Sequence, residues 1–203
     1  MNNIYRVHFA GRACLVGGIL EIVMGILYLL TNGLATNKPS PVSLLLLFLV
    51  LNICLMGGPL GLLARRALGS GTAGIIGKAG VVITLLGQLS YIVGMIYIML
   101  NPSQEYAQPF TPAGAGLSAL GMLLVGIATL AAGQLHGGQA FAPLLIPLSY
   151  AIVLPLQIVF FLSKGLPPLL PINFLFWGLM WALVGYAIQS SGEKQATQPG
   201  IAR

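Results

Sequence analysis

Apolar stretches long enough to cross a lipid bilayer follow one another along almost the entire chain. A transmembrane helix needs about 20 consecutive apolar residues to span the hydrocarbon core. Only 6% of the 203 residues are charged, whereas a soluble domain carries about 25% charged residues. The chain therefore lacks the polar material that would cover a water-soluble globule, and lipid is the expected solvent for most of its surface.

These stretches predict an all-α membrane protein, a bundle of six transmembrane helices that forms one domain over residues 1–188. The predicted spans cover residues about 11–31, 42–63, 75–100, 113–132, 143–162 and 169–188. Short segments rich in Pro, Gly and Asn separate them, as is typical of turns. Residues 189–203 are polar and predict a disordered tail.

The basic residues predict the orientation, because cytoplasmic loops of membrane proteins carry an excess of Lys and Arg. With a cytoplasmic N-terminus and six spans, most basic residues fall on the cytoplasmic side, and only Lys38 and Lys164 fall outside. The cytoplasmic set is Arg6, Arg12, Arg65, Arg66, Lys78, Lys194 and Arg203. Both termini are therefore expected in the cytoplasm, with the protein in the cell membrane of a prokaryote.

Glycines recur every seven residues in several predicted spans. The set comprises Gly11, Gly18 and Gly25, then Gly80, Gly87 and Gly94, and finally Gly178 and Gly185, with Gly114, Gly121 and Ala128 in the fourth span. Residues seven apart lie on one helix face, so each set forms a smooth stripe for close helix packing. The first two sets differ by a constant 69 residues. Duplication of a unit and packing alone both explain this offset, and packing is the favoured interpretation.

Glu21 lies near the middle of the first predicted span. A carboxyl group at that depth costs free energy unless it is protonated, paired or hydrated, and so indicates a functional site. Asn52 and Gln88 lie at similar depth in the next two spans, and Lys78 could reach Glu21 from the cytoplasmic side by snorkelling. The four residues predict an intramembrane polar site. Interhelical hydrogen bonds that only fix the packing are the alternative.

The residue inventory argues against an enzyme, a metal centre and a bound cofactor. The sequence has three acidic residues, all Glu. Glu105 and Glu193 lie outside the spans, so paired-carboxylate chemistry with Glu21 is not available. Both histidines, His8 and His136, lie at the cytoplasmic edge, away from any haem or nucleophile within a span. The basic residues are scattered, which argues against nucleic acid as a partner.

Two segments carry a resemblance to known proteins. The segment 60–66 (LGLLARR), followed by a Gly-rich loop and 77–80 (GKAG), resembles the short basic loop of small prokaryotic multi-span membrane proteins. Segment 177–187 (WGLMWALVGYA) resembles their last helix. The resemblance implies a bundle of about six helices and brings no activity, cofactor or catalytic residue with it.

Two functions remain open from the sequence. The first is binding or transport of a small solute, with Glu21 as the protonatable group. The second is a non-catalytic structural or accessory subunit that packs through its glycine stripes against itself or other membrane subunits. A water-accessible cavity that reaches Glu21 and Gln88 would favour the first function. A dry, filled interior with an outward glycine face would favour the second.

Overall fold

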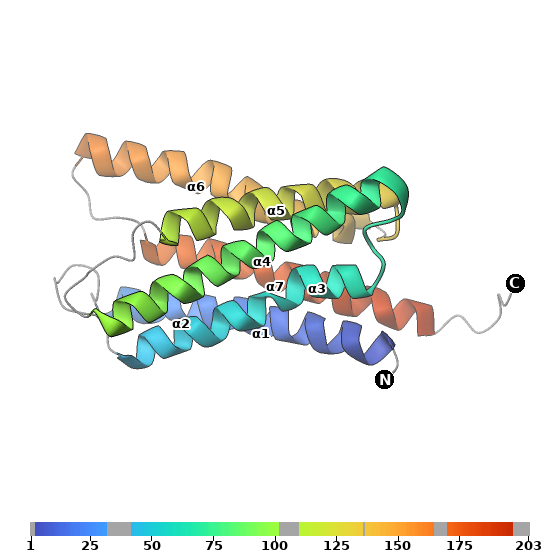
Figure 1. Cartoon of the computed structure of the whole chain (residues 1–203). Coiled ribbons are helices and arrows are strands. Elements are labelled where there is room, and N and C mark those ends of the chain that lie inside the picture. The colour runs from blue at the N-terminus through green and yellow to red at the C-terminus, as the bar shows by residue number, and fades with distance from the viewer. Residues whose placement is uncertain (1–2, 32–41, 102–109, 136, 165–169, 197–203) are drawn as a thin grey trace, which may run out of the picture.

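A computed structural model describes residues 3–31, 42–101, 110–135, 137–164 and 170–196 (Figure 1). Within these ranges every regular element is a helix. The α-helices are α1 (Asn3–Thr31), α2 (Val42–Leu55), α3 (Gly57–Ala64), α4 (Gly71–Leu100), α5 (Phe110–Ala132), α6 (Ala142–Lys164) and α7 (Leu170–Ala196), and a 3-10 helix, η1 (Gly137–Phe141), precedes α6. The predicted all-α class is therefore confirmed.

Five helical segments in the described part of the chain are long and apolar enough to cross a membrane. They are Tyr5–Leu27, Leu45–Ala64, Gly71–Leu100, Phe110–Ala132 and Ile172–Ser190. A shorter apolar segment, Gly137–Val153, covers η1 and the first half of α6. These segments indicate a membrane-embedded protein, and the count of six spans stays a prediction.

Helices α2 and α3 run in the same direction as one arm, and the arms alternate in direction along the bundle and pack around a closed ring (Figure 1). Helix α1 packs against α2 and α3, which in turn pack against α4. The ring continues through α5 and α6 to α7, and α7 returns to α1. Helix α1 therefore begins at the end of the bundle where α7 ends (Figure 1). The side of the membrane on which this end lies stays a prediction.

The bundle has an apolar exterior and places several polar side chains inside. Large side chains such as Phe9, Val50 and Leu89 are exposed on the outer surface, where lipid would solvate them. The buried polar side chains are Glu21, Asn52, Thr84, Gln88, Ser118 and Thr129. Thr84 and Thr129 each donate to the carbonyl oxygen four residues earlier, at 2.8 Å. Those two hydroxyls are thus satisfied within their own helices.

The second predicted span consists of two helices that meet at Met56. Gly57 and Gly58 follow the junction, and Pro59 lacks the backbone N–H that a continuous helix would use there. A Cβ atom on Gly57 would clash with the Ala10 carbonyl oxygen, and one on Gly58 would lie 2.9 Å from the Trp181 ring. The two glycines therefore let this junction press against α1 and α7.

Helix α3 ends in a Schellman motif that has Arg66 at the position usually taken by glycine. The Arg66 N–H donates to the Leu63 carbonyl at 3.0 Å, and the Ala67 N–H donates to the Leu62 carbonyl at 3.0 Å. Arg66 has a φ of 62°, in the left-handed region that is costly for residues with a Cβ atom.

Replacement of Arg66 by Gly is therefore expected to stabilise the protein by about 1 kcal/mol, because Gly adopts this conformation without steric cost. Thermal unfolding of the purified protein in detergent would measure the gain. The exposed Lys78→Gly variant, placed inside α4, should instead lower stability, since an interior helical Gly is unfavourable. An Arg66→Gly variant that is less stable than wild type would contradict this expectation.

The predicted disordered tail is corrected for residues 189–196, because α7 continues to Ala196. Contacts from other elements hold this end of the helix. The Arg65 Nη1 atom donates to the Ile188 carbonyl oxygen at 2.8 Å, and the Gln139 Nε2 atom donates to Ser190 Oγ at 2.9 Å. Both partners come from distant parts of the sequence, so local composition does not reveal them. Residues 197–203 lie outside the described residues.

Candidate functional site

The glycine stripes of α1 and α7 face each other in an antiparallel pair. A Cβ atom on Gly18 would lie 2.5 Å from both the Ala182 nitrogen and the Gly178 oxygen, and one on Gly178 would lie 2.6 Å from the Gly18 oxygen. Farther along, a Cβ atom on Gly185 would lie 2.8 Å from the Gly11 oxygen. The two backbones are in contact at these positions, and no side chain fits between them.

Helices α4 and α5 form a second pair of the same kind. A Cβ atom on Gly87 would lie 2.8 Å from the Gly114 oxygen and 2.7 Å from the Ser118 nitrogen. One on Gly80 would lie 2.6 Å from the Gly121 oxygen. Gly25 and Gly94, the third members of their stripes, are buried as well.

The two pairs repeat the same contacts at equivalent positions. Gly18 contacts Gly178 and Ala182, which lie four residues apart on α7. Gly87 contacts Gly114 and Ser118, which lie four residues apart on α5. Glycines 69 residues apart on α1 and α4 thus take part in the same packing arrangement, which the bundle uses twice. Duplication of the sequence stays a hypothesis. The stripes face partner helices within the bundle and do not form an outward face at these positions.

Glu21 and Gln88 lie inside the bundle with unsatisfied acceptors. Glu21 is 5% exposed, and its Oε2 atom has no hydrogen-bond partner. Gln88 is fully buried and donates from Nε2 to Ser118 Oγ at 3.0 Å, but its Oε1 atom has no partner. Buried polar atoms are nearly always hydrogen-bonded in native proteins. These two oxygens therefore mark the interior positions at which a donor is expected.

Helix contacts place Asn52 at the level of Glu21. Leu55, one turn after Asn52, lies against Gly17 of α1, one turn before Glu21. However, the Asn52 Nδ2 atom donates at 2.7 Å to the Phe48 carbonyl oxygen in its own helix. This donor of the Asn52 amide is thus used within α2, whereas the packing interpretation expected an interhelical hydrogen bond.

Lys78 does not lie with the other three predicted site residues. It is exposed in the first part of α4, and its neighbour Gly77 lies against Leu68 at the turn between α3 and α4. Glu21 is buried near the middle of α1, and no ion pair connects it to another described residue. The structure therefore places Lys78 at the end of the bundle, where its ammonium group stays solvated.

Comparisons with protein-family models, curated proteins and solved structures find no match for this chain. The resemblance to small multi-span membrane proteins stays a prediction.

Aromatic side chains from four helices lie at the level of the polar residues. The ring of Phe48 on α2 has its centroid 6.0 Å from that of Tyr91 on α4 and 5.8 Å from that of Phe174 on α7. Tyr150 on α6 lies 5.3 Å from Trp177 on α7. All three pairs meet edge to face. Residues on four separate helices leave no local pattern in the sequence, so the sequence does not reveal these pairs.

Trp181 adds an unsatisfied donor to the interior. Its side chain is fully buried against Gly58 and Cys14, and its Nε1 atom has no hydrogen-bond partner. Its carbonyl oxygen accepts a hydrogen bond from the Cys14 thiol at 3.3 Å. The bundle interior therefore contains both unsatisfied acceptors and an unsatisfied donor.

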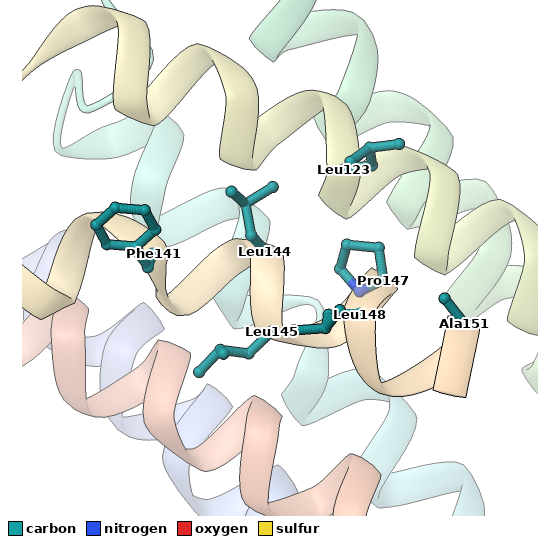
Figure 2. A pocket seen from close by; sticks show the side chains of 7 residues that line it. All are labelled: Leu123, Phe141, Leu144, Leu145, Pro147, Leu148 and Ala151. Carbon is teal, nitrogen blue, oxygen red and sulfur yellow. The ribbon is translucent and has the colours of Figure 1, made fainter. Parts of the chain in front are cut away.

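A groove of about 470 Å³ lies on the outer side of α5 and α6 (Figure 2). Its lining is Leu123, Phe141, Leu144, Leu145, Pro147, Leu148 and Ala151. The lining is apolar and includes none of the four predicted site residues. Within the described ranges, no group of three or more His, Cys, Asp or Glu residues could hold a metal ion.

Proposed function

We propose that this protein binds or transports a small solute within the membrane and that Glu21 is its protonatable group. The observation that carries the proposal is the unpartnered Oε2 atom of Glu21 inside the bundle, where the Oε1 atom of the buried Gln88 is unpartnered as well. An unsatisfied buried polar group costs roughly 1–3 kcal/mol. Either a proton on Glu21 or a donor group on a bound solute would remove this cost.

The surroundings of Glu21 favour exchange between these two states. Four other titratable side chains lie partly or fully buried in the middle of the described helices: Cys14 on α1, Cys54 on α2, Tyr91 on α4 and Tyr150 on α6. All four are neutral in their usual forms near neutral pH. Since no described cation is paired with Glu21, an ionised carboxylate there would lack compensation unless a solute supplied it.

Glu21→Gln is the decisive variant, because Gln keeps the size and hydrogen-bonding capacity of the side chain and cannot titrate. Infrared difference spectra of the protein in lipid, recorded between about pH 5 and pH 9, should show a reversible carboxyl C=O band that Glu21→Gln lacks. Lys78→Gln, which alters an exposed charge, should leave this band unchanged. A wild-type spectrum without a titrating carboxyl band in this range would contradict the proposal.

The accessory-subunit function keeps one observation in its favour. Large side chains, including Leu51, Met122, Ile146 and Trp181, are fully buried in the bundle, and the backbones of both glycine-packed pairs are in contact. If packing is the only role of the interior, Glu21→Gln should fold normally, and Glu21→Leu should stabilise the protein by removing a buried carboxyl group. The accessory role would be favoured if Glu21→Leu is more stable than the wild type and the wild type has no carboxyl group that titrates.

A further inference from the structure

Five aromatic side chains lie around the level of Glu21, and we call them the aromatic cluster. They are Phe48, Tyr91, Tyr150, Phe174 and Trp177. The ring of Phe48 packs edge to face against Tyr91 and Phe174, and the ring of Tyr150 packs in the same way against Trp177. Trp177 lies one helical turn after Phe174, so α7 connects the two groups. The cluster thus extends across α2, α4, α6 and α7.

Backbone contacts bring Glu21 to this cluster. A Cβ atom on Gly178 would lie 2.9 Å from the Ile22 nitrogen, so the α1 backbone beside Glu21 is level with the α7 backbone beside Trp177. Asn52, at the level of Glu21, lies one turn after Phe48, whose ring centroid is 6.0 Å from that of Tyr91. Glu21 therefore lies at the level of aromatic rings from α2 and α7, which pack against α1, and from α4 and α6.

This combination of groups selects the charge of a ligand. Aromatic faces carry negative electrostatic potential and attract cations, above all alkylated ammonium groups. A carboxylate adds one full negative charge and repels anions. In the described part of the chain, no Lys, Arg or His side chain is buried that would neutralise it.

We propose that the solute bound at this site is a small organic cation of the alkylammonium class, held by the Glu21 carboxylate and the aromatic cluster. The inference rests on the proposed function, because it names the ligand class of the same site. On binding, the cation replaces the proton of Glu21. The Glu21 O–H bond breaks, its proton passes to water, and the monovalent cation takes the position opposite the carboxylate. The total charge of the site is then the same before and after exchange.

Choline and its uncharged isostere 3,3-dimethylbutan-1-ol are suitable probes, because they differ in charge and hardly in shape. Isothermal titration of the full-length protein in lipid nanodiscs would measure both affinities. Titration in two buffers with different protonation enthalpies would count the protons released. We expect choline to bind at least about 10-fold more tightly than the alcohol, with close to one proton released, and Glu21→Gln to abolish this preference.

Variants at Tyr91 separate a role of the aromatic face from a role of the hydroxyl. Tyr91→Leu should weaken choline binding by roughly 5–30-fold, and Tyr91→Phe should retain most of it, because Phe keeps the aromatic face. Thermal unfolding of both variants shows whether they are folded. A Tyr91→Phe variant that is folded and binds choline as weakly as Tyr91→Leu would overturn the role of the ring.

The outcomes distinguish this inference from the proposed function. If Glu21 titrates but choline binds no better than the alcohol, the cation is the wrong ligand class, while the protonatable site remains. If Glu21 does not titrate and choline does not bind, both proposals fail. Equal choline binding by wild type and Glu21→Gln would overturn the assignment of the cation to Glu21.

Discussion

Gly18→Ala is expected to destabilise the protein by about 3 kcal/mol, which is at the upper end of the cost of overpacking. The added methyl group would lie 2.5 Å from the Ala182 nitrogen and 2.5 Å from the Gly178 oxygen. Both atoms belong to the α7 backbone, so no side-chain rotation relieves the clash. The helices must separate and lose packing along the pair, which is the main source of helix association in lipid. Thermal unfolding in detergent or lipid nanodiscs would measure the loss.

Gly116→Ala is the matched control for this variant. Gly116 also lies inside a helix, but a Cβ atom there would meet no atom within 4 Å. The free energy of unfolding of Gly116→Ala should equal that of the wild type or exceed it by up to about 1 kcal/mol, because Ala is the better helix former. Equal effects of the two substitutions would show that helix propensity, and not contact between α1 and α7, decides the role of Gly18.

Trp181→Ala is expected to cost about 3 kcal/mol, since it removes a large, fully buried side chain and leaves a cavity. The Trp181 ring covers Gly58 and Cys14, so the cavity would lie where α1, α3 and α7 meet. Trp181→Phe retains most of the ring and removes the unpartnered N–H group. This second variant should therefore cost less than about 1.5 kcal/mol.

Denaturant or thermal unfolding of the two Trp181 variants would test this difference. If Trp181→Phe is as destabilised as Trp181→Ala, the Nε1–H group makes a strong hydrogen bond in the native protein, and the ring alone does not account for the stability. Trp177, which also contributes to tryptophan fluorescence, is unchanged in both variants and can report on unfolding.

The sequence determined the class of this protein, because hydrophobic length and scarce charge are local properties. The helices begin and end within a few residues of most predicted spans, and the spacing of Gly18 or Gly87 marked the faces that pack closely. The depth of Glu21 was also readable, since rise per residue converts position along a helix into depth. The break at Met56 and the extension of α7 to Ala196 were less accessible, because contacts with distant segments produce them.

Only the tertiary structure decided which stripes meet and what surrounds Glu21. The stripes of α1 and α4 are alike in sequence, yet one meets α7 and the other meets α5. The order of the helices around the ring decides which helix each stripe contacts, and the sequence of a single helix carries no information about that order. In the same way, Asn52 bonds within its own helix, Lys78 lies on the surface, and Tyr150 and Trp177 approach the level of Glu21. The physical reason is that a spacing defines a face of one helix, whereas a site requires faces from several helices to meet.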